Sequence, residues 1–179
     1  METINSLSKG PVNRVALSGL LTLDPESLRP KNKLKEYDLR QNLYLDQVIR
    51  EKDFRLALLN FDWATYNGFS VALFCSVEAI IPLWAYMLVA TYLQPYTVEL
   101  VQGNLEDLEK ALWHKAIENL DLTAYINKRV VIKGCGEHPI PISVYVELIG
   151  KLKPHVKSLL FGEPCSTVPL YKASIKEIQ

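Results

Sequence analysis

The sequence predicts an α/β fold in which a single domain, residues 1–179, carries a mixed, largely parallel sheet with flanking helices. First, short β-branched apolar runs alternate with segments of helical periodicity, which is typical of α/β proteins. Second, residues 71–103 resemble residues 130–162. Third, a chain of 179 residues suits one core of ordinary size. We therefore expect a tandem strand–helix–strand duplication.

The internal repeat is defined by matched residues that lie 59 positions apart. The matched pairs are Pro82 with Pro141, Tyr86 with Tyr145, Pro95 with Pro154, and Gly103 with Gly162. Cys75 matches Cys135 at a spacing of 60, which indicates one extra residue in the second connecting loop.

The N-terminal part is predicted to contain one strand and two helices. Residues 1–14 are polar and predict a loose leader, and 15–23 predict a strand. Asp24-Pro25 is a helix-start signal, but Pro30 limits that helix to a short one. The basic stretch 29–36 is expected to be a loop, and 43–60 a helix that ends near Asn60.

Each repeat copy is predicted to fold as strand, helix and strand. In the first copy these are 69–75, 83–93 and 96–101; in the second they are 128–133, 141–152 and 155–161. A helix over 105–120, with its apolar residues at helical spacing, connects the copies. The tail from Glu163 to Lys172 contains two prolines and is expected to be an ordered loop or an edge.

Charge and hydropathy exclude several classes of function. The net charge is zero and the pI is about 6.8, so nothing predicts a nucleic-acid partner. The start of the chain has no apolar signal core, and the most apolar window, 80–93, is too short to span a bilayer. We expect a cytoplasmic protein with no membrane partner, whose three cysteines stay reduced.

The cysteines define the expected site. Cys75 and Cys135 each lie at the carboxyl end of a predicted strand and precede a helix, and Cys165 follows the last strand of the second copy. Parallel α/β sheets bind ligands at the carboxyl ends of their strands. If the copies pack side by side, the cysteines share one rim. The alternative is a purely structural role, in which each thiol is a small buried apolar group.

Two kinds of chemistry fit these residues. Cys135, His138 and Cys165 would supply ligands for zinc or iron, with Cys75 completing four. Alternatively, Cys135 or Cys165 acts as a nucleophilic thiol, with His138, Glu163 or Glu78 as its base. No known cysteine-hydrolase signature, GxGxxG motif or Walker motif occurs, and the sequence does not decide whether the protein is an enzyme.

Two further patterns allow an interaction role. Trp84, Tyr86, Met87 and Tyr92 lie at helical spacing, which predicts core packing or otherwise a subunit interface in a homo-oligomer. The charged stretch 50–55 alternates in sign and predicts a solvated ion-pair network rather than an anion site.

Three strings carry a family resemblance: IREKDFR at 49–55, AIIPLWAYML at 79–88 and FGEPCSTVPLYK at 161–172. Over about residues 37–172 they resemble a bacterial family known as domain of unknown function 2480, with Glu78 where that family usually has aspartate. Genes of the family often neighbour iron–sulfur assembly genes, so the resemblance implies a protein of that machinery as a partner.

Together these observations predict an accessory factor of thiol, metal or iron–sulfur metabolism with a cysteine-centred site. Only the second copy places glycines around its cysteine and continues into Glu163 and Cys165, so chemistry is expected there and a structural role for Cys75. The alternative is a non-enzymatic adaptor or oligomeric interaction protein with structural cysteines.

Overall fold

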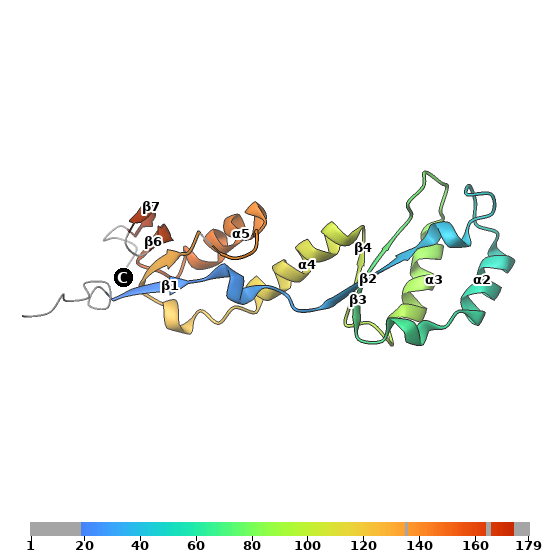
Figure 1. Cartoon of the computed structure of the whole chain (residues 1–179), viewed down its shortest axis with the longest axis horizontal. Coiled ribbons are helices and arrows are strands. Elements are labelled where there is room, and N and C mark those ends of the chain that lie inside the picture. Colours follow the sequence, from blue (N-terminus) through green and yellow to red (C-terminus); the bar gives the residue numbers. More distant parts are fainter. Residues whose placement is uncertain (1–18, 135, 164–165, 174–179) are drawn as a thin grey trace, which may run out of the picture. The chain divides into compact units, whose positions relative to one another are not determined.

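The computed structural model describes residues 19–134, 136–163 and 166–173 (Figure 1). Its contacts divide the chain into two compact units: unit 1 contains Met1–Arg29 and Ile117–Gln179, and unit 2 contains Pro30–Ala116. The α/β fold class is confirmed, but the described strands form two sheets instead of one, one sheet in each unit. The single-domain organisation stays a prediction.

Unit 2 is built on a three-stranded parallel sheet with the order β2-β3-β4. Its strands are β2 (Lys33–Asp38), β3 (Phe69–Phe74) and β4 (Glu99–Gln102). Its helices are α2 (Glu51–Asn60), α3 (Leu83–Leu93) and most of α4 (Leu105–Glu118). Figure 1 shows α3 between the sheet and α2.

The main core of unit 2 lies between one face of the sheet and the helices α2 and α3. Val71 and Leu73 of β3 contact Val89 and Leu93 of α3 within one buried cluster, which also holds Phe54 and Leu58 of α2 and the rings of Tyr37, Trp63 and Tyr66. On the other face of the sheet, Ala72 packs against Leu108 and Leu112 of α4. Unit 2 is therefore a layered structure whose central strand is buried on both faces, as parallel sheets require.

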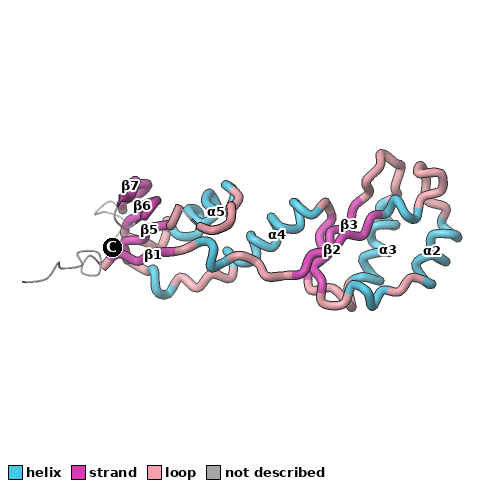
Figure 2. The backbone as a smooth tube through the Cα atoms, in the orientation of Figure 1, coloured by secondary structure: helices cyan, strands magenta, loops and turns pink. Residues whose placement is uncertain are grey.

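Unit 1 has a four-stranded sheet with the order β1-β5-β6-β7 (Figure 2). In this sheet only β7 is antiparallel to its neighbour. Its strands are β1 (Leu20–Leu23), β5 (Arg129–Ile132), β6 (Ser158–Glu163) and β7 (Ser166–Lys172), and its helix is α5 (Ile142–Leu152). Val144, Leu148 and Leu152 of α5 are buried, as are Val130 and Ile132 of β5. No helix in the described parts of either unit is long and apolar enough to cross a membrane.

The two units are structural duplicates at the spacing of 59 residues. Ser70 pairs with Glu99 in unit 2 as Arg129 pairs with Ser158 in unit 1, and α3 and α5 begin and end at matched positions. The duplication also includes the first strand of each unit. Asp38 at the end of β2 and Asp24 directly after β1 each accept a hydrogen bond from a backbone N–H two residues later.

Most predicted elements are confirmed, with shifted ends and with the tail at an edge of the sheet, and two differ. The stretch 29–36, expected to be a loop, contributes most of β2, an edge strand whose charged residues hide its pattern. The helix expected over 43–60 begins only at Glu51, because Tyr44 and Val48 pair across a turn. The strand expected over 15–23 is described from Leu20, and the tail forms the edge strand β7.

Candidate functional site

The carboxyl edge of the unit 1 sheet carries a charged group at the end of each parallel strand. Asp24 follows β1, Lys133 follows β5, and Glu163 ends β6. Lys133 Nζ donates to Asp24 Oδ2 over 2.9 Å, with both side chains about one third exposed. This bond lowers the pKa of Asp24 and raises the pKa of Lys133, to which the nearby Glu163 and Glu26 carboxylates also contribute. The edge is therefore a charged site where α/β sheets bind ligands.

Glu26 links the β1 end of this edge to the loop between β5 and α5. Its Oε1 lies 2.8 Å from His138 Nδ1, and its Oε2 accepts from the backbone N–H of Glu137 over 3.0 Å. These two bonds lower the pKa of Glu26, the His138 bond most. Because an ionised carboxylate only accepts, Nδ1 carries the shared proton. In the neutral ring the Nε2 lone pair is then left for a proton or a metal.

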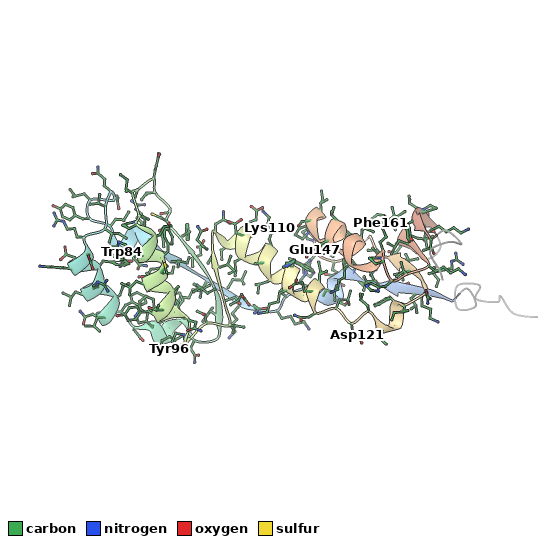
Figure 3. All side chains as sticks on the ribbon, turned by 180° about the vertical axis from the view of Figure 1, so that it is seen from behind. Trp84, Tyr96, Lys110, Asp121, Glu147 and Phe161 are labelled. Atoms are coloured by element: carbon green, nitrogen blue, oxygen red, sulfur yellow. The ribbon has the colours of Figure 1, made fainter. Side chains whose placement is uncertain are left out.

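The same loop is fixed by Arg29 and by two close glycine contacts. Arg29 donates to the carbonyl oxygens of His138 and Pro139 at 3.3 and 2.8 Å. A Cβ on Gly136 would lie 2.5 Å from Glu26 Oε2, and one on Gly134 would lie 2.5 Å from the ring of Phe161, which is labelled in Figure 3. Neither glycine could carry a side chain without displacing its neighbour. The described residues of this loop are thus held to the segment that follows β1, and Gly134 lies close to Phe161 of β6.

The equivalent edge of unit 2 has a different chemistry. Asp38 accepts from the N–H of Ser76 over 3.0 Å, and the Cys75 thiol donates to the Val77 carbonyl oxygen over 3.3 Å. Burial raises the pKa of Tyr86, and the neighbouring Cys75 and Asp38 add to this. Cys75 is a free, partly buried cysteine packed against the unit 2 core, consistent with a structural role.

The predicted site residues divide into three groups. His138 and Glu163 both lie at the carboxyl edge of the unit 1 sheet. Cys135 and Cys165 lie outside the described residues, so their roles as nucleophiles or metal ligands stay predictions. Cys75 and Glu78 belong to unit 2, whose sheet is separate from that of unit 1, so the two copies do not form one common sheet rim.

A metal site would need the cysteines. Within residues 19–134, 136–163 and 166–173, no group of three or more His, Cys, Asp or Glu side chains is arranged to hold a metal ion. His138 has a carboxylate partner of the kind that orients metal-binding histidines, but the described residues alone do not complete a ligand set for zinc or iron.

Asp24, Glu26, Arg29 and Lys133 are site residues that the sequence reasoning missed. In the sequence, Asp24 and Glu26 predict only the start of a helix. This prediction is confirmed, because Asp24 caps the short helix η1 (Pro25–Leu28), which contains Glu26. The available signal was that Asp24 directly follows a predicted strand and Lys133 is the last residue of another. Parallel strands end at one edge, so this position marks residues that meet there.

The aromatic residues of α3 and the charged stretch 50–55 have mostly structural roles. Trp84, Tyr86 and Tyr92 of α3 pack against the unit 2 core, as predicted, whereas Met87 is 69% exposed. In the charged stretch of α2, Arg55 pairs with Glu51 at the surface, which agrees with the predicted solvated ion pairs.

Comparison with known proteins identifies a family and no activity. Neither the curated proteins nor the solved structures contain a significant match to this chain. The family model described as "Protein of unknown function (DUF2480)" matches residues 10–173, which is nearly the whole sequence. The chain therefore belongs to this family of proteins of unknown function, DUF2480.

Proposed function

We propose that this protein is a cytoplasmic accessory factor of thiol, metal or iron–sulfur metabolism, and that it acts at the carboxyl edge of the unit 1 sheet. The observation that carries the proposal is the 2.8 Å contact between Glu26 and His138. A carboxylate that fixes one imidazole nitrogen leaves the other poised as a base or a ligand. With about two thirds of its side chain exposed, His138 is open to a substrate or cargo.

The proposed chemistry uses the thiols of Cys135 and Cys165 together with this histidine. Cys135 lies three residues before His138, between Gly134 and Gly136. In the thiol role, His138 Nε2 takes the proton of a cysteine thiol, giving a thiolate and an imidazolium that Glu26 stabilises. Cys135 and Cys165 are the proposed thiols and Glu163 a supporting carboxylate. In the metal role, Cys135, His138 and Cys165 are the proposed ligands for zinc or iron.

Metal analysis and thiol titration of protein purified without a histidine tag test this proposal. We expect either a bound metal that is lost in Cys135→Ser, His138→Ala and Cys165→Ser, or a thiol that reacts faster than a denatured cysteine and slows in His138→Ala. Cys75→Ser is the matched control, because it removes the thiol of the other copy. Metal-free protein whose cysteines react no faster than denatured ones would overturn the site.

The alternative proposal is an adaptor or homo-oligomeric interaction protein, and a second observation favours it. Unit 2 exposes large apolar side chains on two segments that lie side by side. Val48 and Ile80 join these segments in a parallel β-bridge. The exposed residues of this surface are Tyr44, Leu45, Val48, Ile80 and Leu83. Leu45 is 71% exposed and has a φ of 53°, a strained conformation for leucine that places an apolar side chain at the tip of a turn.

The oligomeric state tests the alternative. Light scattering after size-exclusion chromatography is expected to show a dimer or higher oligomer that dissociates in Leu45→Asp combined with Leu83→Asp. The matched control is Leu56→Asp, another exposed leucine of unit 2 that lies on α2. A monomeric wild type, or equal dissociation in the control, would contradict an interface at this surface.

A further inference from the structure

A pocket of about 360 Å³ lies at the amino end of the unit 1 sheet, the end opposite the carboxyl-edge site. It is formed where the turn after α5, the turn before β5 and the end of β7 meet. Lys153, His155, Lys157 and Tyr171 contribute to its lining, and no carboxylate is among the lining residues. Its volume falls within the range of small-molecule sites.

The cations of this pocket are available to a ligand. Lys153 Nζ lies 5.3 Å from the centre of the Tyr171 ring, and within the described part of the chain neither Lys153 nor Lys157 forms an ion pair. Lysines of a folded surface are commonly balanced by nearby carboxylates, so two that share a hollow whose described lining contains no carboxylate favour a bound anion.

The duplicated unit shows that the fold does not need these cations. In unit 2 the residues equivalent to Lys153, His155 and Lys157 are Gln94, Tyr96 and Val98. The backbone bonds are nevertheless the same. The N–H of Gly68 donates to the carbonyl oxygen of Tyr96 over 3.0 Å, as the N–H of Asn127 donates to the carbonyl oxygen of His155 over 2.8 Å. A neutral turn therefore folds in the same way as the cationic one.

Unit 1 also supplies a wall that unit 2 lacks. β7 pairs with β6 and ends in Ala173, whose N–H donates to the Lys157 carbonyl oxygen over 3.0 Å. In unit 2 the equivalent strand, β4, has no such neighbour among the described strands, and the Tyr96 side chain (labelled in Figure 3) occupies the position of His155. The cations and the wall that encloses them thus occur together, in one copy only.

We propose that this pocket binds the phosphate group of a small soluble ligand. Two ammonium groups and an imidazole suit a compact group with two negative charges, and Asn127 adds a side-chain amide. A small ligand is favoured over a nucleic acid or a membrane, because the whole chain has zero net charge and the two lysines meet at one small hollow instead of an extended basic surface.

Calorimetric titration of the full chain with inorganic phosphate and pyrophosphate, at constant ionic strength, tests the proposal. The pocket variant is Lys153→Gln with Lys157→Val, which introduces the residues that unit 2 carries at these positions and is expected to fold. We expect it to bind pyrophosphate at least about tenfold more weakly, because it loses two charge-assisted contacts. Amide shifts of Asn127 and Lys157 in NMR spectra should locate the binding.

The control variant, Lys31→Gln with Lys52→Gln, makes the same change in net charge on exposed lysines of unit 2. It should bind as the wild type does. Three results would overturn the proposal: no pyrophosphate binding by the wild type, equal weakening in both variants, or binding to duplex DNA or anionic vesicles that depends on the pocket lysines while phosphate and pyrophosphate give no response.

Discussion

Replacing Leu93 with alanine should strongly destabilise unit 2. Leu93 ends α3, is completely buried and belongs to the cluster with Val71, Val89 and Trp63. Leucine to alanine removes three carbon groups, and at about 0.8 kcal/mol for each buried group the transfer cost is about 2.4 kcal/mol. The cavity left behind raises the expected loss to about 3–5 kcal/mol, since close-packed neighbours relax only in part.

Chemical denaturation followed by tryptophan fluorescence measures this loss. All three tryptophans, Trp63, Trp84 and Trp113, belong to unit 2, so their emission reports its unfolding. The matched control is Met87→Ala on the same helix, which removes a side chain of similar size that is 69% exposed and should cost less than about 1 kcal/mol. If Leu93→Ala costs no more than Met87→Ala, the described packing of α3 is wrong.

Three other predictions concern two glycines and one ion pair. Gly103→Ala should destabilise by about 1–3 kcal/mol, because Gly103 has a φ of 137° and a Cβ there would lie 2.5 Å from Asp107 Oδ2. Gly150→Ala, within α5 and with nothing within 4 Å of its Cβ, should stabilise by about 0.5–1 kcal/mol; denaturation midpoints that move in the opposite directions would refute both. The pair of Asp24 with Lys133 should stabilise between about pH 3.8 and 10.5, since the folded protein has a lowered pKa for Asp24 and a raised one for Lys133. The stability difference between wild type and Asp24→Asn should therefore shrink as pH falls through the folded pKa of Asp24, and a difference that grows in acid would contradict the pairing.

The repeat was the part of the fold that the sequence predicted best. Proline at the start of each repeat helix and glycine after each closing strand are local signals, and α3 occupies the range expected from them. β2 was missed because it is an edge strand in which four of the six residues are charged and only Leu34 and Tyr37 are apolar. Its identity depends on pairing with β3, which is a long-range contact that a local pattern does not contain.

For the candidate site, the sequence located the carboxyl edge of the sheet but not the residues from the N-terminal segment that contact it. His138 and Glu163 were found because they lie within three residues of Cys135 and Cys165 in the sequence. Glu26 and Arg29 were not, because they contact the loop of His138 from more than one hundred residues away in the chain. Once β1 is known to lie beside β5, that proximity follows from the parallel register.

The order of the strands has a consequence for how the chain folds during synthesis. Unit 2 is continuous in sequence, so it can complete its sheet as soon as it leaves the ribosome. Unit 1 cannot, because β1 emerges first and must wait for β5, which is roughly one hundred residues later. The carboxyl-edge site therefore assembles last, after an already folded neighbour, and the exposed β1 edge is the segment that a chaperone would need to protect in the interval.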